Sequence, residues 1–290
     1  MSFSPTASIV IPAYNAQSTL RACLESVCAL EFPQTQFEIF VVDNNSHDNT
    51  RSVIQAFAPR IQYLYEKKRG PAAARNCGIA HAQNEIVAFT DADCVVEREW
   101  LAQLVAPLRD ENVGIVGGAI RAVSVENAVE KFGEQINDQE KAICLYAPPH
   151  VASANWASPR AVLNQVGRFD ANLRGGEDTD LAWRMLQLGK RIAYQATARV
   201  YHRNESTMRG LFRQGFQHGY NSIFVNRKHE KFLQTFGHRR FARVSYIRLL
   251  TSLRAYLATG STDALCDVSF NGGKKLGKLV GSLRAGYLEL

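Results

Sequence analysis

The chain has 290 residues, of which 46% are hydrophobic, and a formal net charge of +7. This length and apolar content allow a sizeable core in one large domain. No stretch approaches the ~18 uncharged apolar residues of a membrane-spanning helix, and the first residues lack the charged and apolar regions of a signal peptide. The composition therefore argues against a membrane-spanning protein, and we expect a cytoplasmic one.

The positive charge is concentrated near the C-terminus. Residues 227–290 contain 12 Lys and Arg against 4 Asp and Glu, a net charge of +8, whereas the other residues contain 22 against 23, a net charge of −1. Such asymmetry indicates either a polyanionic partner, such as a membrane surface or nucleic acid, or a solvated basic face. The six cysteines form no Cys-x-x-Cys pair, so neither a zinc site nor a disulfide framework is suggested.

Strand and helix patterns alternate along the first 90 residues. The apolar run over residues 8–12 predicts a buried strand, and apolar residues at helical spacing over 20–28, behind Ser18 as a cap, predict a helix. Further strands are predicted over 37–42, 61–65 and 85–90, with helices over 50–57 and 72–82. This order predicts an α/β fold with a mostly parallel sheet and helices on both faces, to about residue 120. Ligands of such sheets bind beyond the carboxyl ends of the strands, where the polar clusters lie.

Asp91 and Asp93 follow the predicted strand over residues 85–90. Paired carboxylates at a strand end suit Mg²⁺ or Mn²⁺, which keep coordination positions for water and for substrate phosphate oxygens. The same pattern occurs in solvated turns. It is also similar to the nucleophile motif of haloacid-dehalogenase-like phosphatases, in which Asp91 would be the nucleophile. That motif usually lies near the start of a chain, whereas three strand–helix units precede Asp91 here.

Four segments at strand ends decide between these interpretations. In order they are Ile9-Val10-Ile11-Pro12-Ala13-Tyr14-Asn15, the run over 41–50, the run over 70–78, and Asp91-Ala92-Asp93. Together they closely resemble the inverting family 2 glycosyltransferases over roughly residues 8–215. The resemblance implies a GT-A type, Rossmann-like domain over residues 1–225 and a basic C-terminal helical segment over 226–290. It also implies a nucleotide-sugar donor, an acceptor hydroxyl and a divalent metal cofactor, Mn²⁺ or Mg²⁺.

The resemblance places the donor nucleotide on the early segments. The expected contacts are Pro12, Tyr14, Asn15, Asp43, Asn45, Arg75 and Asp91. Pro12 and Tyr14 would shape one wall of a base-binding slot, and Asp43 is a candidate acceptor for the N3–H of uracil, which cytosine lacks, so a UDP-sugar is favoured. The run over 43–46 is also typical of a simple turn and helix cap. Arg75, at a helix start, would offer its guanidinium to phosphate, ribose or sugar groups, or would simply be exposed.

The run over residues 175–184 contains the candidate catalytic base. Its glycines permit close approach of backbone to ligand, and its carboxylates open a helix whose N-terminus favours negative charge. The resemblance assigns Asp178 as general base and Glu177 to the sugar side, although a helix N-cap would also explain Asp178. Asn155 and Trp156 resemble the acceptor-side loop, in which Trp156 would stack on a sugar ring unless it lies in the core.

The resemblance also assigns His202, at the end of an apolar strand over 198–201, to the metal beside Asp93. Processive members of the family carry Gln-x-x-Arg-Trp, whereas this chain has Arg213-Gln214-Gly215-Phe216-Gln217, which argues against a processive polymer synthase. Between residues 239 and 257, apolar residues recur every three or four positions among five arginines. This pattern predicts a basic amphipathic helix, either on an anionic membrane or packed on the catalytic body.

Three other functions remain open at this point. A haloacid-dehalogenase-like phosphatase would use Asp91, and a sugar-phosphate nucleotidyltransferase would need a Gly-rich, basic phosphate loop that the N-terminal region lacks. A non-catalytic carbohydrate-binding or nucleic-acid-binding protein has no need of both Asp93 and Asp178. We therefore expect an enzyme whose partners are a nucleotide-sugar and a glycan, lipid-linked or other hydroxyl acceptor, with nucleic acid an unexpected partner.

Overall fold

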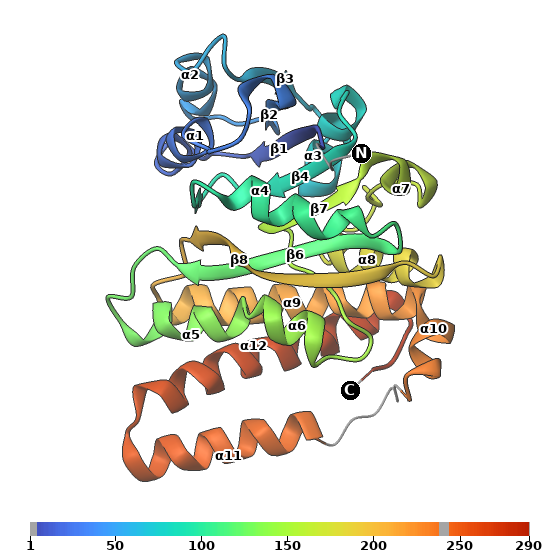
Figure 1. Ribbon diagram of the computed structural model, residues 1–290. Coiled ribbons are helices and arrows are strands. Elements are labelled where there is room, and N and C mark those ends of the chain that lie inside the picture. The colour runs from blue at the N-terminus through green and yellow to red at the C-terminus, as the bar shows by residue number, and fades with distance from the viewer. Residues whose placement is uncertain (1–4, 238–243, 290) are drawn as a thin grey trace. The chain divides into compact units, whose positions relative to one another are not determined.

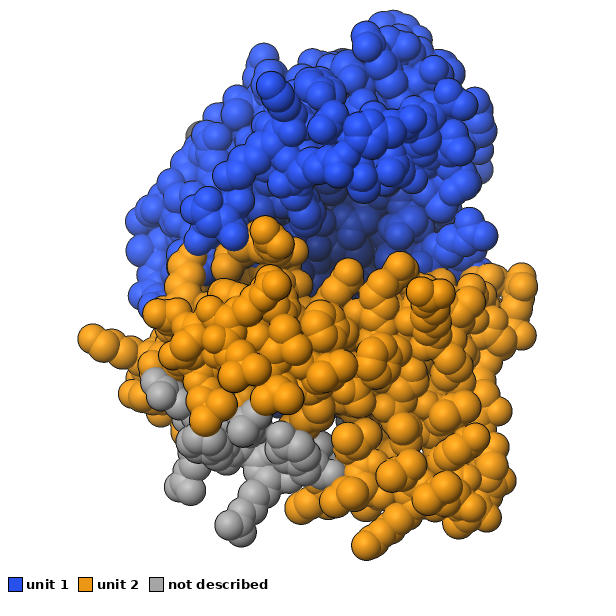
Figure 2. Space-filling view, turned by 180° about the vertical axis from the view of Figure 1, so that it is seen from behind, with its two compact units in different colours: residues 1–123, 137–172, 177–203 blue, residues 124–136, 173–176, 204–290 orange. Residues whose placement is uncertain are grey.

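The computed structural model describes residues 5–237 and 244–289 (Figure 1). The chain divides into two compact units, shown in two colours in Figure 2. Unit 1 comprises residues 1–123, 137–172 and 177–203, and unit 2 comprises residues 124–136, 173–176 and 204–290. The boundary predicted at residue 225 falls inside helix α9 (Met208–Lys228), and both units are discontinuous in sequence.

Unit 1 contains an eight-stranded mixed sheet with the order β3-β2-β1-β4-β7-β6-β8-β5. Its strands are β1 (Ala7–Ala13), β2 (Phe37–Asp43), β3 (Gln62–Tyr65), β4 (Ile86–Thr90), β5 (Cys94–Val96), β6 (Val113–Ala122), β7 (Asn155–Pro159) and β8 (Arg191–His202). Strands β3, β2, β1 and β4 are parallel, as are β6 and β8, whereas β7 is antiparallel to β4 and β6 and β5 is antiparallel to β8. The expected α/β class with a mostly parallel sheet is confirmed.

The register aligns the carboxyl ends of the first strands. Ala13 is paired with Asp43 across β1 and β2, and Asp43 is paired with Tyr65 across β2 and β3. The loops that follow these three strands therefore leave the sheet at the same edge. This is the edge at which open α/β sheets bind ligands.

Helices cover both faces of this sheet, as Figure 1 shows. In unit 1 they are α1 (Leu20–Cys28), α2 (Thr50–Gln55), α3 (Pro71–His81), α4 (Trp100–Val105), α6 (Gln139–Cys144), α7 (Arg160–Gln165) and α8 (Glu177–Gln187), with short 3₁₀ turns η1 (Gln34–Gln36) and η2 (Ala106–Arg109). Successive residues of β1 enter different cores: Ile9 and Ile11 pack with α1 and α4, and Val10 packs with α3 and α8. Alternation along a strand places its side chains on opposite faces, so each face needs its own helical layer.

One detail of the first helix differs from the sequence prediction. Thr19, not Ser18, precedes α1, and its side chain makes no capping bond. The backbone N–H groups of Thr19 and Leu20 instead donate to the carbonyl of Ala16. A turn of backbone thus begins the helix without a side-chain cap.

Unit 2 is helical, which confirms the predicted C-terminal helical segment. It contains α5 (Ala128–Ile136), α9 (Met208–Lys228), α10 (Glu230–Thr235), α11 (Val244–Thr259) and α12 (Thr262–Ala285). The amphipathic helix predicted between residues 239 and 257 is α11, and its first predicted residues, Arg239, Arg240 and Arg243, lie outside the described part. Within the described residues, no helix is long and apolar enough to cross a membrane.

Candidate active site

The loops after β1 and β2 are joined by hydrogen bonds between side chains and backbone. Asn15, at a positive φ of 48°, accepts a bond at Oδ1 from the N–H of His47 (2.9 Å), and its own N–H donates to Ser46 Oγ (3.0 Å). The N–H of Gln17 donates to Asp48 Oδ2 (3.1 Å). Asparagine tolerates the left-handed conformation better than most residues. Hydrogen bonds therefore hold together the segments over 12–15 and 43–48, both expected at the donor nucleotide, and the two segments form one wall of the candidate site.

Asp43 is 4% exposed at the end of β2. One carboxylate oxygen accepts from the N–H of Ser46 (2.9 Å), and the other accepts from the hydroxyl of Tyr63 (3.2 Å). The bond from Ser46 closes a simple turn over residues 43–46, which the sequence allowed as the alternative to a nucleotide contact. An ionised carboxylate offers about four acceptor positions, so these bonds leave one on each oxygen.

Two tyrosines beside this wall are about half exposed. The guanidinium of Arg69 lies 5.2 Å from the ring centroid of Tyr14. The hydroxyl of Tyr65 donates to Oδ1 of Asn45 (3.0 Å), which has a positive φ of 62°. Flat aromatic faces with a neighbouring cation suit stacking against a planar, electron-rich group such as a nucleobase.

Asn44 fixes the approach to helix α3. Its Nδ2 donates to the carbonyls of Glu66 (3.1 Å) and Lys68 (2.7 Å), and its Oδ1 accepts from the N–H of Gly70 (2.8 Å). Gly70 has φ 128°, a conformation that side chains disfavour, and Pro71 follows at the first helical position. From the sequence we assigned no role to Asn44, because the sequence of a polar turn does not indicate which groups one of its asparagines will bond to.

Arg75 joins the Asp-x-Asp motif to α8. Its Nη2 donates to Asp91 Oδ1 (2.8 Å) and its Nη1 donates to Glu177 Oε1 (2.9 Å). Arg75 and Glu177 are buried, and Asp91 is partly exposed. The expectation that Arg75 offers its guanidinium to phosphate, and that Glu177 faces the sugar, does not match this arrangement, because the two side chains neutralise each other in the interior. Burial raises the pKa of Glu177, as does the charge of Asp178, while Arg75 lowers it.

Asp93 and His202 lie together, as expected. The pairing of Cys94 with His202 across β5 and β8 brings them close, and His202 Nε2 lies 3.5 Å from Asp93 Oδ2, with both side chains partly exposed. Neighbouring ligands of an octahedral Mg²⁺-type ion, each at ~2.1 Å, lie about 3 Å apart. The pair therefore fits a shared divalent ion.

Two protein ligands also fit the chemistry of such ions. In the described chain, no group of three or more His, Cys, Asp and Glu is arranged to hold a metal by itself. Mg²⁺ and similar ions are commonly held by one or two carboxylates, water and substrate phosphates. Burial raises the pKa of Asp93, and the neighbouring His202 opposes this shift.

Three carboxylates occupy the first turn of α8, and their surroundings differ. Asp180 is buried and paired with Arg184 (2.7 Å), and Glu177 is buried against Arg75. Asp178 is partly exposed, and it is the second residue of the helix rather than its N-cap. Its Oδ2 accepts from the N–H of Ser153 (3.1 Å), and its Oδ1 accepts from the N–H of Thr179 (2.7 Å).

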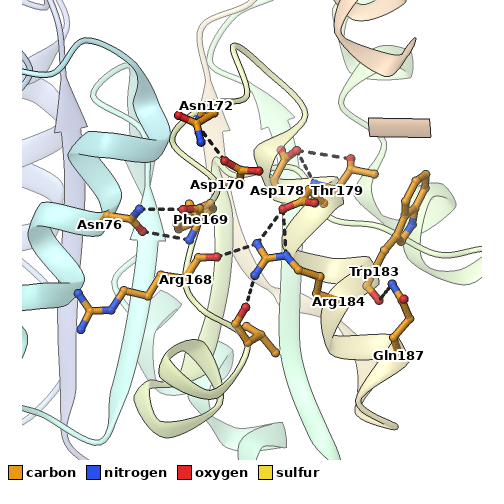
Figure 3. Close-up of polar contacts among 12 residues, drawn as sticks. Asn76, Arg168, Phe169, Asp170, Asn172, Asp178, Thr179, Trp183, Arg184 and Gln187 are labelled. Carbon is orange, nitrogen blue, oxygen red and sulfur yellow. Dashed lines mark hydrogen bonds and ion pairs between the residues drawn. The ribbon is translucent and has the colours of Figure 1, made fainter. Parts of the chain in front are cut away.

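Figure 3 shows how α8 and α3 are both anchored to the segment over residues 166–172. The side chain of Asn76 in α3 exchanges two hydrogen bonds with the backbone of Phe169 (2.8 and 3.0 Å). Arg184 in α8 donates to the carbonyl of Arg168 (2.7 Å) as well as to Asp180. Arg75 lies next to Asn76 in α3, and Asp178 lies six residues before Arg184 in α8. These bonds therefore hold Arg75 and Asp178 in a fixed arrangement.

Asn155 and Trp156 do not occupy an acceptor-side loop. They begin β7, and both are fully buried. Asn155 accepts from Trp100 Nε1 (2.8 Å) and donates to the carbonyls of Ala119 and Ala198, and the Trp156 ring stacks on Phe89 with 4.5 Å between centroids. The core position that was left open for Trp156 is the one found here, and neither side chain has exposed surface to offer to an acceptor.

A buried glutamine that the sequence did not reveal shapes the neighbouring loop. Gln139 Nε2 donates to the carbonyl of Asn155 (2.6 Å), and its Oε1 accepts from the N–H of Ala152 (2.5 Å). This places Ser153 where its N–H reaches Asp178. No periodicity or motif marks Gln139, because its partners lie in a loop distant along the chain.

Comparison with known proteins identifies relatives. Glycosyl transferase family 2 matches residues 8–171. The chain is 29% identical to the glycosyltransferase AglE of Haloferax volcanii over 197 residues, 66% of this chain and 64% of that protein. It is 30% identical to the pre-mycofactocin glycosyltransferase of Mycobacterium tuberculosis over 222 residues, 73% of this chain and 46% of that protein. The chain thus spans less than two thirds of the length of either relative.

Solved structures show the same fold. The mannosyltransferase PcManGT from Pyrobaculum calidifontis, in complex with GDP-Man and Mn²⁺, has a TM-score of 0.72 at 20% identity, covering 97% of this chain and 88% of that one. Residues 1–349 of Staphylococcus aureus TarS, in complex with UDP, have a TM-score of 0.55 at 18% identity, covering 97% and 92%. These likenesses confirm the expected GT-A type of fold. The family match covers more than half of the chain and includes all four strand-end segments, and the chain belongs to glycosyl transferase family 2.

Proposed function

We propose that this protein transfers a sugar from a UDP-sugar to an acceptor hydroxyl, with inversion and with the help of a divalent metal. Membership of family 2 supports the reaction class. The observation that carries the proposal is the first turn of α8, where arginines neutralise Glu177 and Asp180 and leave Asp178 as the partly exposed carboxylate. Through Arg75, this turn is connected to the Asp-x-Asp motif.

In this proposal Asp178 is the general base. It accepts the proton of the acceptor hydroxyl while the acceptor oxygen forms a bond to the anomeric carbon and the bond from that carbon to the diphosphate oxygen breaks. One displacement from the opposite face inverts the anomeric configuration. Bonds from Ser153 and Thr179 N–H orient the carboxylate, and its raised pKa makes it a stronger base than an ordinary Asp.

The donor would lie along the strand edge described above. Asp93 and His202 would hold Mg²⁺ or Mn²⁺, which when bound neutralises charge on the departing diphosphate. Tyr14 and Tyr65 would flank the base, and Asp43 would accept from uracil N3–H. Arg75 positions Asp91 rather than binding phosphate itself.

The phosphatase alternative has weaker support. It requires a free Asp91 nucleophile, whereas Asp91 Oδ1 is paired with buried Arg75, which disperses the negative charge that a nucleophile uses. A glycan, a lipid-linked sugar or another hydroxyl compound remains the proposed acceptor class.

Calorimetry of UDP binding tests the donor site. We expect UDP to bind with Mn²⁺, and Asp93→Ala or EDTA to weaken binding by about 10-fold or more, since loss of even a residue that only supports a metal ligand typically costs about 10- to 100-fold. CDP should bind more weakly than UDP, because it leaves a buried acceptor without its donor. Glu111→Ala, which removes an exposed carboxylate of unit 1, is the control.

Each half of this test can fail separately. UDP affinity that survives both EDTA and Asp93→Ala would remove the metal from the proposal. Equal affinities for UDP and CDP would remove the Asp43 contact and leave the nucleotide base unassigned.

We also propose that the basic segment over residues 227–290 contacts an anionic membrane surface. Its net charge of +8 supports an anionic partner. Membership of a glycosyltransferase family gives no reason to propose nucleic acid.

A further inference from the structure

Unit 2 exposes two rows of large apolar side chains. The first row lies on α11 and consists of Ile247, Leu250, Leu253 and Leu257. The second row lies on α12 and consists of Leu276, Leu279 and Leu283. Their exposed fractions range from 39% to 74%, and each row repeats at three or four residues, which is one side of a helix. Contiguous exposed apolar surface of this kind marks an interaction site.

The inner sides of both helices are already occupied. On α12, Gly273, Gly277 and Gly281 face the backbone of α9. On α11, Ser252 donates to the carboxylate of Asp267 on α12. The apolar row of α11 is therefore exposed, and the helix does not use this row to pack on the rest of unit 2.

Both rows face away from the contact between the two helices and are tilted toward a common side of the pair. Ser252 and Asp267 are both seven or eight residues from the turn at Gly260, so the helices run antiparallel. A helix turns about 100° per residue. On this basis the centre of each row lies roughly 150–160° around its helix from the Ser252–Asp267 contact, in the same rotational sense, and the opposite chain directions tilt both rows toward one side of the pair.

Charge distinguishes between possible occupants of this side. Lys274, Lys275 and Arg284 lie among the leucines of α12, as does Lys278, which is paired with the buried Glu289, and residues 227–290 have a net charge of +8. A second copy of the chain would bring +8 against +8, which opposes association. An anionic bilayer supplies both the opposite charge and an apolar interior.

We infer that α11 and α12 lie in the interface of an anionic bilayer, with both leucine rows inserted among the acyl chains and the neighbouring Lys and Arg at the headgroups. This rests on the proposed membrane contact and specifies the surface that makes it. Insertion of apolar side chains adds a contribution to the binding free energy that salt does not screen. Binding by charge alone, in contrast, is lost as the salt concentration rises.

Vesicle co-sedimentation tests the insertion. The full-length protein is mixed with phosphatidylcholine vesicles with and without phosphatidylserine, at low and high salt. We expect Leu276→Ser/Leu279→Ser/Leu283→Ser to reduce partitioning by about 10-fold or more at high salt, with residual binding at low salt. Leu188→Ser, an exposed leucine of unit 1, should bind as the wild type does.

The outcomes separate the two proposals. Equal partitioning of the triple variant and the wild type would overturn insertion while keeping the membrane contact. No wild-type binding to phosphatidylserine vesicles at low salt would overturn both, and sugar transfer to an acceptor in solution would still be measured independently.

A fluorescence variant keeps the test decisive if the triple variant folds poorly. The three native tryptophans, Trp100, Trp156 and Trp183, are buried in unit 1. Leu283→Trp adds an exposed indole at a position that is 73% exposed. We expect anionic vesicles to shift its emission to the blue and brominated acyl chains to quench it, with neither effect for Leu188→Trp.

Absence of both effects in Leu283→Trp would overturn the inference. A dimer seen by sedimentation velocity without lipid would also overturn the inference, if the triple leucine substitution abolishes that dimer. In that case the rows would belong to a second copy of the chain.

Discussion

At the residue scale, two adjacent carboxylates have different chemical roles because their neighbours differ. Glu177 shares a buried guanidinium with Asp91. Asp178 receives backbone N–H bonds from Ser153 and Thr179 but no direct arginine contact is seen in the described chain. Glu177 therefore stabilises the arrangement of the site, and Asp178 is available to take up a proton.

Replacing Asp178 by Asn tests this division of roles. We expect the transfer rate to fall by about 10² to 10⁴, the usual contribution of a positioned general base. UDP-sugar affinity should stay nearly unchanged, since Asp178 makes none of the proposed donor contacts and the amide oxygen keeps one of the two backbone N–H bonds, from Ser153 or from Thr179. Single-turnover kinetics and calorimetry on one preparation provide both values.

Glu177→Gln is the matched control for Asp178→Asn. It removes the charge of the neighbouring buried carboxylate and should lower stability more than it lowers the rate of the chemical step. Near-normal turnover of Asp178→Asn would contradict the assignment and move the base to another carboxylate.

The pH dependence of stability offers a second test of Asp178. Burial raises its pKa, and the N–H bonds from Thr179 and Ser153 and the positive charge of Arg75 oppose this only in part. Between the unfolded pKa, about 3.9, and the higher folded pKa, the folded state binds more protons, so the free energy of unfolding falls as pH rises. Asp178→Asn removes this loss, so its stability relative to the wild type should be higher at pH 7 than below pH 4.

Urea unfolding at both pH values measures the difference. The same raised pKa should place the acidic limb of the activity profile above the range of an ordinary Asp, since only the ionised form is a base. A variant whose stability relative to the wild type is lower at pH 7 than below pH 4 would show that the ionised carboxylate stabilises the fold instead.

At the element scale, the pairing of α9 with α12 depends on glycine. A Cβ added at Gly219 would lie 1.9 Å from the carbonyl oxygen of Lys274, and one at Gly277 would lie 2.1 Å from that of Phe216. Backbone rather than a flexible side chain is the obstacle in both directions. The two helices can approach this closely only while these positions have no side chain.

Gly277→Ala should therefore destabilise unit 2. Overpacking costs about 1–3 kcal/mol, and an immovable backbone obstacle should place this substitution at the upper end of that range. The control is Gly272→Ala in the same helix, where an added Cβ meets nothing within 4 Å. There the better helix propensity of alanine should add up to about 1 kcal/mol to the free energy of unfolding. Urea unfolding followed by circular dichroism compares them, and equal stabilities would refute the close contact.

The elements of the first 90 residues could be predicted because their signals are local. Apolar runs of β-branched residues alternate with helical spacing, and β1, β2, β3 and β4 lie within a residue or two of their predicted ranges. Strand β7 joins the sheet between β4 and β6 and is antiparallel to both. Its place depends on pairing over long sequence distances, which periodicity does not report.

For the candidate site, too, the positions of residues along the elements could be predicted, whereas their burial could not. The strand-end position of Asp91 and Asp93 and the helical position of Asp178 follow from nearby sequence, and the proximity of His202 to Asp93 matches the family pattern. The burial of Arg75, Asn155 and Trp156 could not be predicted, because it is decided by partners 16 to 102 residues away. Residue type alone does not tell a buried guanidinium from one that meets a ligand.

At the scale of the whole molecule, the proposed activities belong to different units. Every proposed donor, metal and base residue, from Pro12 to His202, lies in unit 1. The leucine rows and the +8 segment lie in unit 2. Chemistry and surface attachment can therefore be perturbed independently, so that a substitution in one unit should leave the proposed activity of the other unchanged.

Hydrogen exchange with and without UDP and Mn²⁺ should show this separation along the chain. A ligand at 100 times its Kd stabilises the state that binds it by about 2.7 kcal/mol. We expect slower amide exchange in the strand-end loops over residues 13–17, 43–50 and 91–95 and at the start of α8, because these segments hold the proposed ligand contacts. Exchange in α11 should be unchanged, since its mostly exposed residues open locally without disturbing unit 1. Protection that appears in α11 but not in the strand-end loops would place the nucleotide outside unit 1 and contradict the proposed site.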